Sequence, residues 1–559
     1  MSKTLSECPE IEVQDIDHLG IVAGIVDEIG IVELIDELIP RHELEKISAG
    51  QIVKAIILNC MAFITSPMYL FYQFFEGKAT EHLLGEGVKA EFISPKRIGR
   101  VMDELYKCGL TKLFAKITLE VVKKFGIEIK LGHLDSTSIS VQGEYLESEE
   151  SGEVNDSESL NEVGIPPEPE PVTITYGYSR DHRPDLKQFT TDLLVSQDCG
   201  IPLFMTIGNG NDSDKKSFIE TIKAFQETWQ GSELEVIVMD SGFFSKENLQ
   251  AIGSQKWISR APNTIKDVNE LCQTLLPERF SPGKINGYSV SEVPSVYGNV
   301  EQRWIIIESE QKRAADLKSL EEKISEKFQE DNRRLATLCH QDFACETDAQ
   351  QAALKFEKTL KFHHLLTVNF EKIAHYSKSG RPPKDDTPSS YTYRIVTSLA
   401  PRKDLIAKLQ RACGRMVLAT NLPKEETYSP DYILQSYKEQ QTCERGFHFL
   451  KDPLFFASRV FLKLPRRVMT LAFLMMLCLV VYSLGQRQLR QTLKACQGTI
   501  PDQKGKPTAR PTLRWIFQCF QSVHLVWLGG VKNQIKLKSR QLDILPFLGN
   551  SIQKYYLLS

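Results

Sequence analysis

The spacing of hydrophobic positions changes along the 559 residues of this chain. Between residues 12 and 129, apolar side chains recur at helical spacing with short breaks, as in "AGQIVKAIILNCMAFI" and "TKLFAKITLEVVKKFG". A period of about 3.6 residues places such side chains on one face of a helix. The pattern therefore predicts a helical N-terminal region.

After residue 126 the pattern becomes that of β-strands. The stretch "IEIKLGHLDSTSISV" (127–141) predicts a strand that Asp135 terminates. "FTTDLLVSQ" and "PLFMTIGNG" predict a hairpin joined by "DCGI". An amphipathic helix with an Asp or Ser cap follows at 212–229, and the buried strand in "ELEVIVMDSGFF" (233–244) stops at Asp240. The predicted order is strand, strand, strand, helix, strand.

A mixed region occupies residues 261–413. It contains strands near "RWIIIES" and "YTYRIVTSLA" and a long charged helical segment (309–362) between them. "GRMVLATNLP" (414–423) then predicts a further strand, and "YILQSYKEQQTCERGFHFLK" (432–451) predicts a helix.

That last helix carries polar side chains on one side. At 100° per residue, the offsets of 3, 7 and 14 from Tyr437 place Gln440, Glu444 and Lys451 at roughly −60°, −20° and −40° from it. A structural face would carry Leu or Ile there, so the stripe predicts a polar site beside the core. An ordinary solvated face is the alternative interpretation.

One segment is long and apolar. "VMTLAFLMMLCLVVYSL" (468–484) has 17 uncharged residues between flanking arginines. A membrane-spanning helix needs about 20 apolar residues, and a shorter segment is more often a helix buried on all sides in a large domain. We expect a buried helix, with a membrane span as the alternative.

The net charge of −4 hides a strong asymmetry. Residues 451–559 contain 17 Lys or Arg against three acids, whereas 144–170 contains ten acids and no base. The acidic stretch also carries Ser and Pro and predicts a solvated, disordered loop. The basic tail points to a polyanionic partner, most commonly nucleic acid.

A second basic cluster begins at "SPKRIGRVMDELYKCGLTKLFAKIT" (94–118). This stretch has a Ser-Pro helix start, a Cys-Gly break and a second helix. It fits a helix-turn-helix that places Lys96, Arg97 and Arg100 on DNA phosphates. An ordinary helical hairpin fits the same pattern.

The spacing of the cysteines and the N-terminal sequence indicate in which cell compartment the protein is expected. The 12 cysteines form no CxxC pair, and Cys339, His340 and Cys345 lack metal-ligand spacing. We expect reduced thiols, with neither disulfides nor structural zinc. "MSKTLSECPEIEVQ" lacks the features of a signal or transit peptide, so a cytoplasmic, nucleoid-associated protein is expected.

Three carboxylates belong together in the predicted order of elements. Asp135 and Asp240 end strands, and Glu444 lies on the helix after the last strand. Such groups repel one another unless divalent cations neutralise them, and hard oxygen ligands suit Mg²⁺ or Mn²⁺ rather than zinc. Two such ions about 3.5–4 Å apart serve phosphodiester chemistry. Taken singly, each Asp is more typical of a cap or turn.

The sequence resembles the DDE transposases of bacterial insertion sequences. Their subgroup signature is Tyr, two residues, Arg, three residues, Glu, six residues, Lys; Tyr437, Gln440, Glu444 and Lys451 fall on that spacing, with Gln440 in place of Arg. A neutral amide loses the charge and the bidentate fork of Arg toward a phosphate. Further stretches that look like this group are "HLDSTSISVQGEY", "YGYSRDHRPDLKQF", "GNGNDSDKKSF", "MDSGFFSKENL", "WISRAP" and "ERGFHFLKDPLFF".

The resemblance implies a fold and a set of roles. The fold is α/β: a ribonuclease-H-like core that carries an inserted α+β domain and follows a helical N-terminal domain. Asp135, Asp240 and Glu444 would be the catalytic residues and hold two Mg²⁺ ions, with Mn²⁺ as a substitute. Tyr437, Gln440, Arg445 and Lys451 would contact DNA. The implied boundaries are 1–125 (helical domain), 126–260 (first part of the core), 261–413 (insertion domain), 414–485 (second part of the core) and 486–559 (basic C-terminal region).

The implied function is that of an insertion-sequence transposase. It would bind the terminal inverted repeats of its element as a homodimer, cut double-stranded DNA and join the ends to a target. Two alternatives remain: a catalytically silent transposase-derived DNA-binding protein and a plain metal-dependent nuclease.

Overall fold

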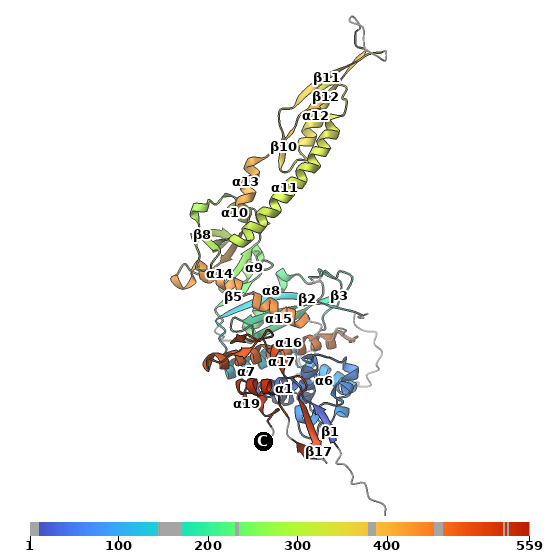
Figure 1. The fold of residues 1–559 in the computed structure, drawn as a ribbon, viewed down its shortest axis with the longest axis vertical. Helices are drawn as coiled ribbons and strands as arrows, with labels where there is room; N and C mark the ends of the chain where they lie inside the picture. The colour runs from blue at the N-terminus through green and yellow to red at the C-terminus, as the bar shows by residue number, and fades with distance from the viewer. Residues whose placement is uncertain are drawn as a thin grey trace, which may run out of the picture. The chain divides into compact units, whose positions relative to one another are not determined.

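The chain forms two compact units in a computed structural model (Figure 1). The first comprises residues 1–257 and 436–559, and the second comprises 258–435. The residues that the structure describes are 11–143, 145, 170–180, 182–229, 234–377, 387–451, 462–528, 531–533 and 536–557. Nearly all of the acidic stretch 144–170 therefore lies outside the described residues.

Helices dominate the first unit up to residue 125, as the periodicity predicts. Ser48 caps one of them through a reciprocal capping box with Gln51. Ser94 caps the next long one by accepting a hydrogen bond from the Arg97 N–H, and Pro95 stands at its first position. The helices are α1 (Leu19–Ile29), α2 (Ile31–Leu38), α3 (Ala49–Cys60), α4 (Phe71–Phe75), α5 (Thr80–Leu84), α6 (Pro95–Lys107) and α7 (Leu110–Phe125).

The sheet of this unit has the order β4-β3-β2-β5. The predicted hairpin is confirmed, since β3 pairs antiparallel with both β2 and β4, while β2 pairs parallel with β5. α8 covers one face, where Phe225 packs edge-on against Phe204. The elements are β2 (Leu131–Val141), β3 (Lys187–Ser196), β4 (Pro202–Gly208), α8 (Asp214–Thr228), β5 (Val236–Met239) and α9 (Lys246–Ala251).

The prediction that Asp135 ends its strand is wrong. β2 runs on to Val141 because residues 136–141 keep pairing with β3. Only the pairing with β5 stops before Asp135, because that strand ends at Met239. The other predicted strand end is confirmed, since Asp240 directly follows β5.

The long apolar segment forms the centre of the first unit. It belongs to α16 (Pro465–Ala495), whose most apolar 18-residue window is 94% buried inside the protein. This helix is the one candidate for a membrane span among the described residues, by length and composition only. It contacts α1, α3, α6 and α7 as well as β4 and α15 (Gln441–Lys451), so α16 lies between N-terminal helices and the sheet, which α7 also contacts directly (Figure 1).

The C-terminal residues fold back onto the N-terminal helices. β17 (His524–Leu528) pairs with β1 (Ile11–Asp15) and β18 (Val531–Asn533), and α19 (Asn550–Gln553) packs against α1. The approach is close: a Cβ on Gly24 would lie 2.6 Å from the Cα of Ile552. α17 (Leu513–Cys519), α18 (Ser539–Ile544) and the short pair β15 (Ile500–Pro501) and β16 (Pro507–Thr508) complete this region.

The second unit contains a sheet of order β6-β14-β9-β8-β7 and a smaller helical and β region. A core of Leu335, Ala349, Ala353, Leu360, Leu365 and Ile395 packs the long helix α11 against its neighbours. The elements are β6 (Lys256–Ala261), α10 (Lys266–Thr274), β7 (Ser281–Pro282), β8 (Tyr288–Tyr297), β9 (Val300–Ser309), α11 (Glu310–Cys339), α12 (Glu346–Glu357), β10 (His363–Leu365), β11 (Asn369–His375), β12 (Ser390–Val396), β13 (Leu399–Pro401), α13 (Lys403–Ala412), β14 (Arg415–Thr420) and α14 (Pro430–Lys438), whose end passes into the first unit.

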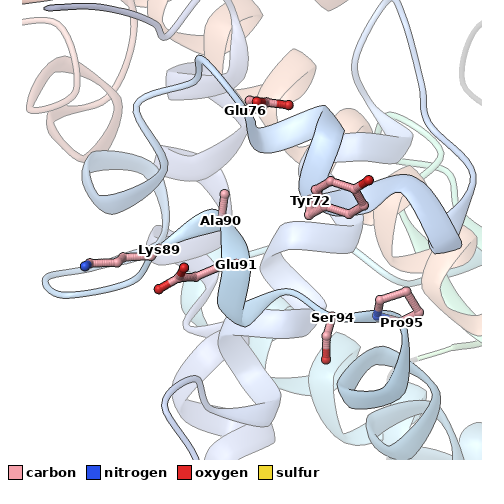
Figure 2. A pocket seen from close by; sticks show the side chains of 7 residues that line it. All are labelled: Tyr72, Glu76, Lys89, Ala90, Glu91, Ser94 and Pro95. Atoms are coloured by element: carbon pink, nitrogen blue, oxygen red, sulfur yellow. The ribbon is translucent and has the colours of Figure 1, made fainter.

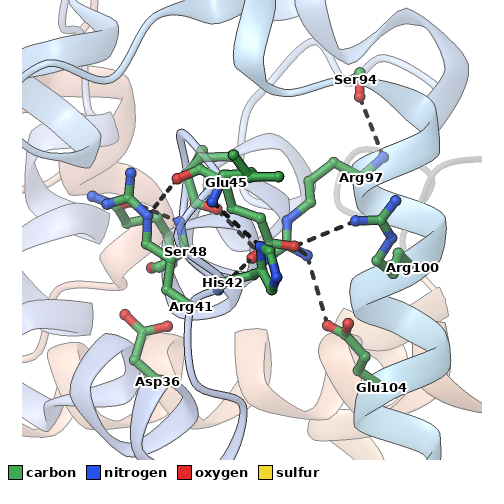
Figure 3. A network of polar contacts seen from close by, with 12 residues as sticks. Asp36, Arg41, His42, Glu45, Ser48, Ser94, Arg97, Arg100 and Glu104 are labelled. Carbon is green, nitrogen blue, oxygen red and sulfur yellow. Dashed lines mark hydrogen bonds and ion pairs between the residues drawn. The ribbon is translucent and has the colours of Figure 1, made fainter.

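A buried ionic network joins α6 to the segment before α3 (Figure 3). The Arg97 guanidinium pairs with Glu45 and lies 3.8 Å from Glu104, and its side chain is only 9% exposed. Arg100 also reaches Glu45, at 3.4 Å. Burial raises the pKa of Glu104, which Arg97 opposes. Arg97 thus belongs to this buried network and is not presented at the surface.

Gly24→Ala should destabilise the protein. Its new methyl group would overlap the backbone of α19, and overpacking costs about 1–3 kcal/mol, whereas Ala gains only about 1 kcal/mol over Gly in a helix. Denaturant unfolding measures the loss. Gly549→Ala is the control, because its methyl would approach a single side-chain atom, the Oε2 of Glu28, at 3.3 Å and no backbone. Equal stability of Gly24→Ala and wild type would contradict the described packing.

Arg97→Ala should destabilise the protein far more than Lys96→Ala. Loss of Arg97 leaves Glu45 and Glu104 without their buried partner, and breaking such a pair costs about 3–5 kcal/mol. Lys96 is exposed on the same helix, so its truncation should leave the free energy of unfolding nearly unchanged. A stable Arg97→Ala variant would show that the network contributes little.

Candidate active site

Asp135 and Asp240 occupy equivalent positions on neighbouring parallel strands. β2 and β5 pair in register from Leu131 opposite Val236 to Leu134 opposite Met239. Asp135 is the next residue of β2, and Asp240 directly follows the end of β5. Parallel strands point their carboxyl ends to one edge, which in open α/β sheets is where ligands bind. The register therefore brings the two carboxylates to the same place.

The environment of Asp135 disfavours its negative charge. Burial, with smaller contributions from the charges of Asp240 and Glu444, raises the pKa of its carboxyl to about 7. Arg180 opposes this shift from 3.8 Å, as does the Ser136 N–H, which donates to the carboxylate at 2.8 Å. The three predicted carboxylates thus lie within electrostatic reach of one another.

The prediction of a single helix over 432–451 is wrong. The structure has two helices, α14 and α15, interrupted at Glu439 and Gln440. The chain stays tightly wound there, since the Gln440 N–H donates to the Tyr437 carbonyl at 3.2 Å and the Cys443 N–H donates to that of Gln440 at 2.9 Å. A regular helical wheel across the four signature positions therefore does not apply.

Small side chains fix α15 against the sheet. The Cys443 Sγ lies 3.7 Å from the carbonyl of Leu193, the residue that pairs with Asp135 across β2 and β3. A Cβ on Gly446 would meet Leu479 of α16 at 3.1 Å. Glu444 is exposed beside this buried stripe. Cys443 and Gly446 thus position Glu444, and the sequence analysis missed them.

The pKa of Cys443 also reflects its closeness to the carboxylates. Its thiol is fully buried, and burial raises its pKa well above the usual value, with the charges of Asp135 and Glu444 adding to the effect. Cys443, Gly446 and Phe447 have the i, i+3, i+4 spacing of one helix face, and all three are buried. This spacing is the sequence pattern from which the role of Cys443 could have been predicted. That spacing marks the inner face of α15.

His133 lies two residues before Asp135 on β2, on the same face of the strand. It is fully buried, and burial lowers its pKa to about 4, so the ring is neutral near pH 7. Neither ring nitrogen has a hydrogen-bond partner among the described residues.

The carboxylate oxygens of the site suit a hard cation, but they do not surround a single ion position. Carboxylate oxygens are the ligands that Mg²⁺ and Mn²⁺ prefer, and burial together with the charges of Asp240 and Glu444 raises the pKa of Asp135. Within the described ranges, however, no three His, Cys, Asp or Glu side chains are close enough to ligate one ion as they stand. Asp135 and Asp240 share an edge of the sheet and Glu444 lies on α15, and the three do not form a single closed ligand set.

The residues proposed for DNA contact differ in exposure. Gln440 is buried at 6% exposure in the break between the helices, Tyr437 and Lys451 are half-buried, and Arg445 is exposed. On α6, Lys96 and Arg100 are exposed, whereas Arg97 is buried in its ionic network. The structure thus does not support a phosphate contact for Arg97. α6 and α7 are joined at Gly109, whose positive φ of 78° breaks the helix.

A cavity of about 530 Å³ lies elsewhere in the first unit (Figure 2). Tyr72 and Glu76 lie across it from Ala90 and Glu91, and Lys89, Ser94 and Pro95 complete its lining. None of the three carboxylates lines it, so this cavity is separate from the site.

Comparisons with known proteins identify the family. Residues 129–481 match the family described as transposase DDE domain, and residues 11–119 match a domain of unknown function, DUF4277. Comparison with curated proteins gives no match.

Two solved structures show a distant likeness. A piggyBac transposase synaptic complex with hairpin DNA has 9% identity and a TM-score of 0.33 over 83% of this chain and 73% of that one. A Mos1 transposase paired-end complex has 12% identity and a TM-score of 0.14 over 34% and 56%. Neither score is high enough to carry an argument. The family match, which spans well over half of the sequence, establishes that this chain belongs to the transposase DDE domain family.

Proposed function

We propose that this chain is an insertion-sequence transposase that cuts and joins DNA at Asp135, Asp240 and Glu444. The observation that carries the proposal is the register of β2 and β5, which places two carboxylates at one sheet edge, together with the rise in the pKa of Asp135 caused by burial and by the charges of Asp240 and Glu444. A site that concentrates negative charge in this way suits cation-dependent chemistry on a phosphodiester.

Each residue has a role in this proposal. Asp135 and Asp240 would hold metal from the sheet, and Glu444 would hold it from α15. Two Mg²⁺ ions, with Mn²⁺ as a substitute, would supply activation of the attacking hydroxyl and stabilisation of the leaving oxygen. Lys451 would neutralise a DNA phosphate as a point charge, and Tyr437 and Arg445 would position the strand, whereas the buried Gln440 would act only through the break between the two helices.

The remaining parts of the proposal concern partners and organisation. The protein would bind the terminal inverted repeats as a homodimer in the cytoplasm, with Lys96 and Arg100 on phosphates. The boundaries 1–125, 126–260, 261–413, 414–485 and 486–559 remain our proposal for its domains. In this scheme the ribonuclease-H-like core carries the insertion domain between its two parts.

One observation favours the silent DNA-binding alternative. Gln440 replaces the Arg of the signature and is buried in the helix break, so it does not present a cation to DNA. End-specific cleavage by the purified protein in Mg²⁺, absent in chelator, would exclude this alternative. Cleavage without preference for element ends would favour a plain nuclease.

Glu444→Gln should abolish cleavage while folding and DNA binding persist. The amide keeps the size of the side chain but removes the charge that a hard cation requires. We expect a loss of more than about 100-fold, because even outer partners of metal ligands contribute about 10–100-fold. Asp135→Asn and Asp240→Asn should behave alike. The matched control is Glu439→Gln, which can still accept the hydrogen bond from Gln197 and should cleave normally. Equal cleavage by Glu444→Gln and wild type would refute the assignment.

The pKa of Asp135 predicts how stability changes with pH in the metal-free protein. Between the ordinary value of 3.8 and the folded value of about 7, the folded protein holds a proton that the unfolded chain releases. The contribution of Asp135 to stability is therefore present below pH 3.8 and is lost as pH rises through about 7. Denaturant unfolding in chelator should show this loss for wild type relative to Asp135→Asn. Parallel pH profiles of the two proteins would contradict the raised pKa.

A further inference from the structure

Two tyrosines that shortly precede Arg180 in the chain are unusually exposed. Tyr176 is 58% exposed and Tyr178 is 87% exposed, in the segment that precedes β3. Aromatic rings contribute most when they are buried against a partner. Two rings left in water close together on the chain therefore suggest a surface that binds something.

The backbone of this segment is held firmly. Thr175 exchanges two backbone hydrogen bonds with Gln188, at 3.2 and 2.9 Å. The buried Gln188 side chain donates to the carbonyls of Tyr178 at 3.2 Å and Gly210 at 2.8 Å. A Cβ on Gly177 would overlap the Gly210 carbonyl, so only glycine permits this approach. The rings are thus presented by a fixed backbone, which lowers the entropy lost on binding.

Arg180 links the tyrosines to the carboxylate site. Its N–H donates to the Ser138 hydroxyl of β2 at 3.3 Å, and its guanidinium lies 3.8 Å from Asp135. The Arg180 side chain remains 29% exposed. Arg183, three residues on, instead makes two hydrogen bonds to Asp185, at 2.8 and 2.7 Å. Arg180 is therefore the cation of this turn that faces the site.

We propose that residues 176–180 hold a DNA strand beside Asp135, with Tyr176 and Tyr178 stacked on unpaired bases and Arg180 on a backbone phosphate. This inference rests on the proposed function and adds a contact outside the signature positions. Every base offers a π-face to an aromatic ring, and the guanidinium fork matches a phosphate. Aromatic stacking and phosphate binding, side by side next to the acidic site, together fit an unpaired DNA strand better than a protein partner.

The test compares binding of two probes in chelator, where cleavage cannot occur. One probe is a blunt DNA duplex, and the other is the same duplex with a single-stranded overhang. Wild type should prefer the overhang, and Tyr178→Ala should lose about 5- to 100-fold in affinity for it, since stacking contributes about 1–3 kcal/mol per base. Tyr178→Phe keeps the ring and should retain the preference. Tyr176→Ala provides a second, independent truncation.

Matched controls separate this contact from general effects. Tyr72→Ala removes another exposed tyrosine, from α4, and should bind both probes as wild type does. Arg180→Ala should weaken binding to both probes, whereas Arg183→Ala should not. Wild-type affinity for the overhang in both Tyr176→Ala and Tyr178→Ala would overturn the proposal.

Cleavage assays distinguish failure of this inference from failure of the proposed function. Glu444→Gln should bind the overhang as wild type does, because Glu444 lies outside residues 176–180. If wild type cleaves but both Tyr176→Ala and Tyr178→Ala keep full affinity, the inference alone fails. If wild type never cleaves yet Tyr178→Ala loses the overhang preference, the strand contact stands and the enzymatic proposal fails.

Discussion

The first unit depends on the burial of one helix that is apolar on all sides. Such a helix has no face for water, so other elements must surround it. α16 meets this constraint with the N-terminal helices on one side and β4 and α15 on the other. Because α15 packs between α16 and the sheet, the same burial that stabilises the unit also fixes the helix that carries Glu444.

Ion pairs within the first unit account for part of the charge asymmetry. Several cations of the basic stretch 451–559 pair with acids from earlier in the chain. Arg466 and Arg467 both bind Asp103, Arg487 binds Asp198, and Lys554 binds Asp27. Part of the positive charge of 451–559 is therefore complemented inside its own unit.

Sequence patterns predicted most elements of the first unit because their signals are local. Ser94 and Pro95 mark a helix start, and an uninterrupted apolar run marks β5. The break at Gln440 has no Gly or Pro to announce it, so a helical pattern runs straight through it. The burial of Arg97 depends on Glu45, about 50 residues away along the chain, and no local rule reveals such a pairing.

The candidate site shows the same division between local and distant information. Two of its carboxylates are recognisable because they follow apolar strand residues, and strand pairing alone brings Asp135 beside Asp240. The third depends on how closely α15 approaches Leu193, which small residues at Cys443 and Gly446 permit. Burial of Asp135, and to a smaller extent the charges of Asp240 and Glu444, raises its pKa and so opposes folding with the group ionised. A protein selected for stability alone would not keep this arrangement, whereas a protein that binds cations at this edge would need it.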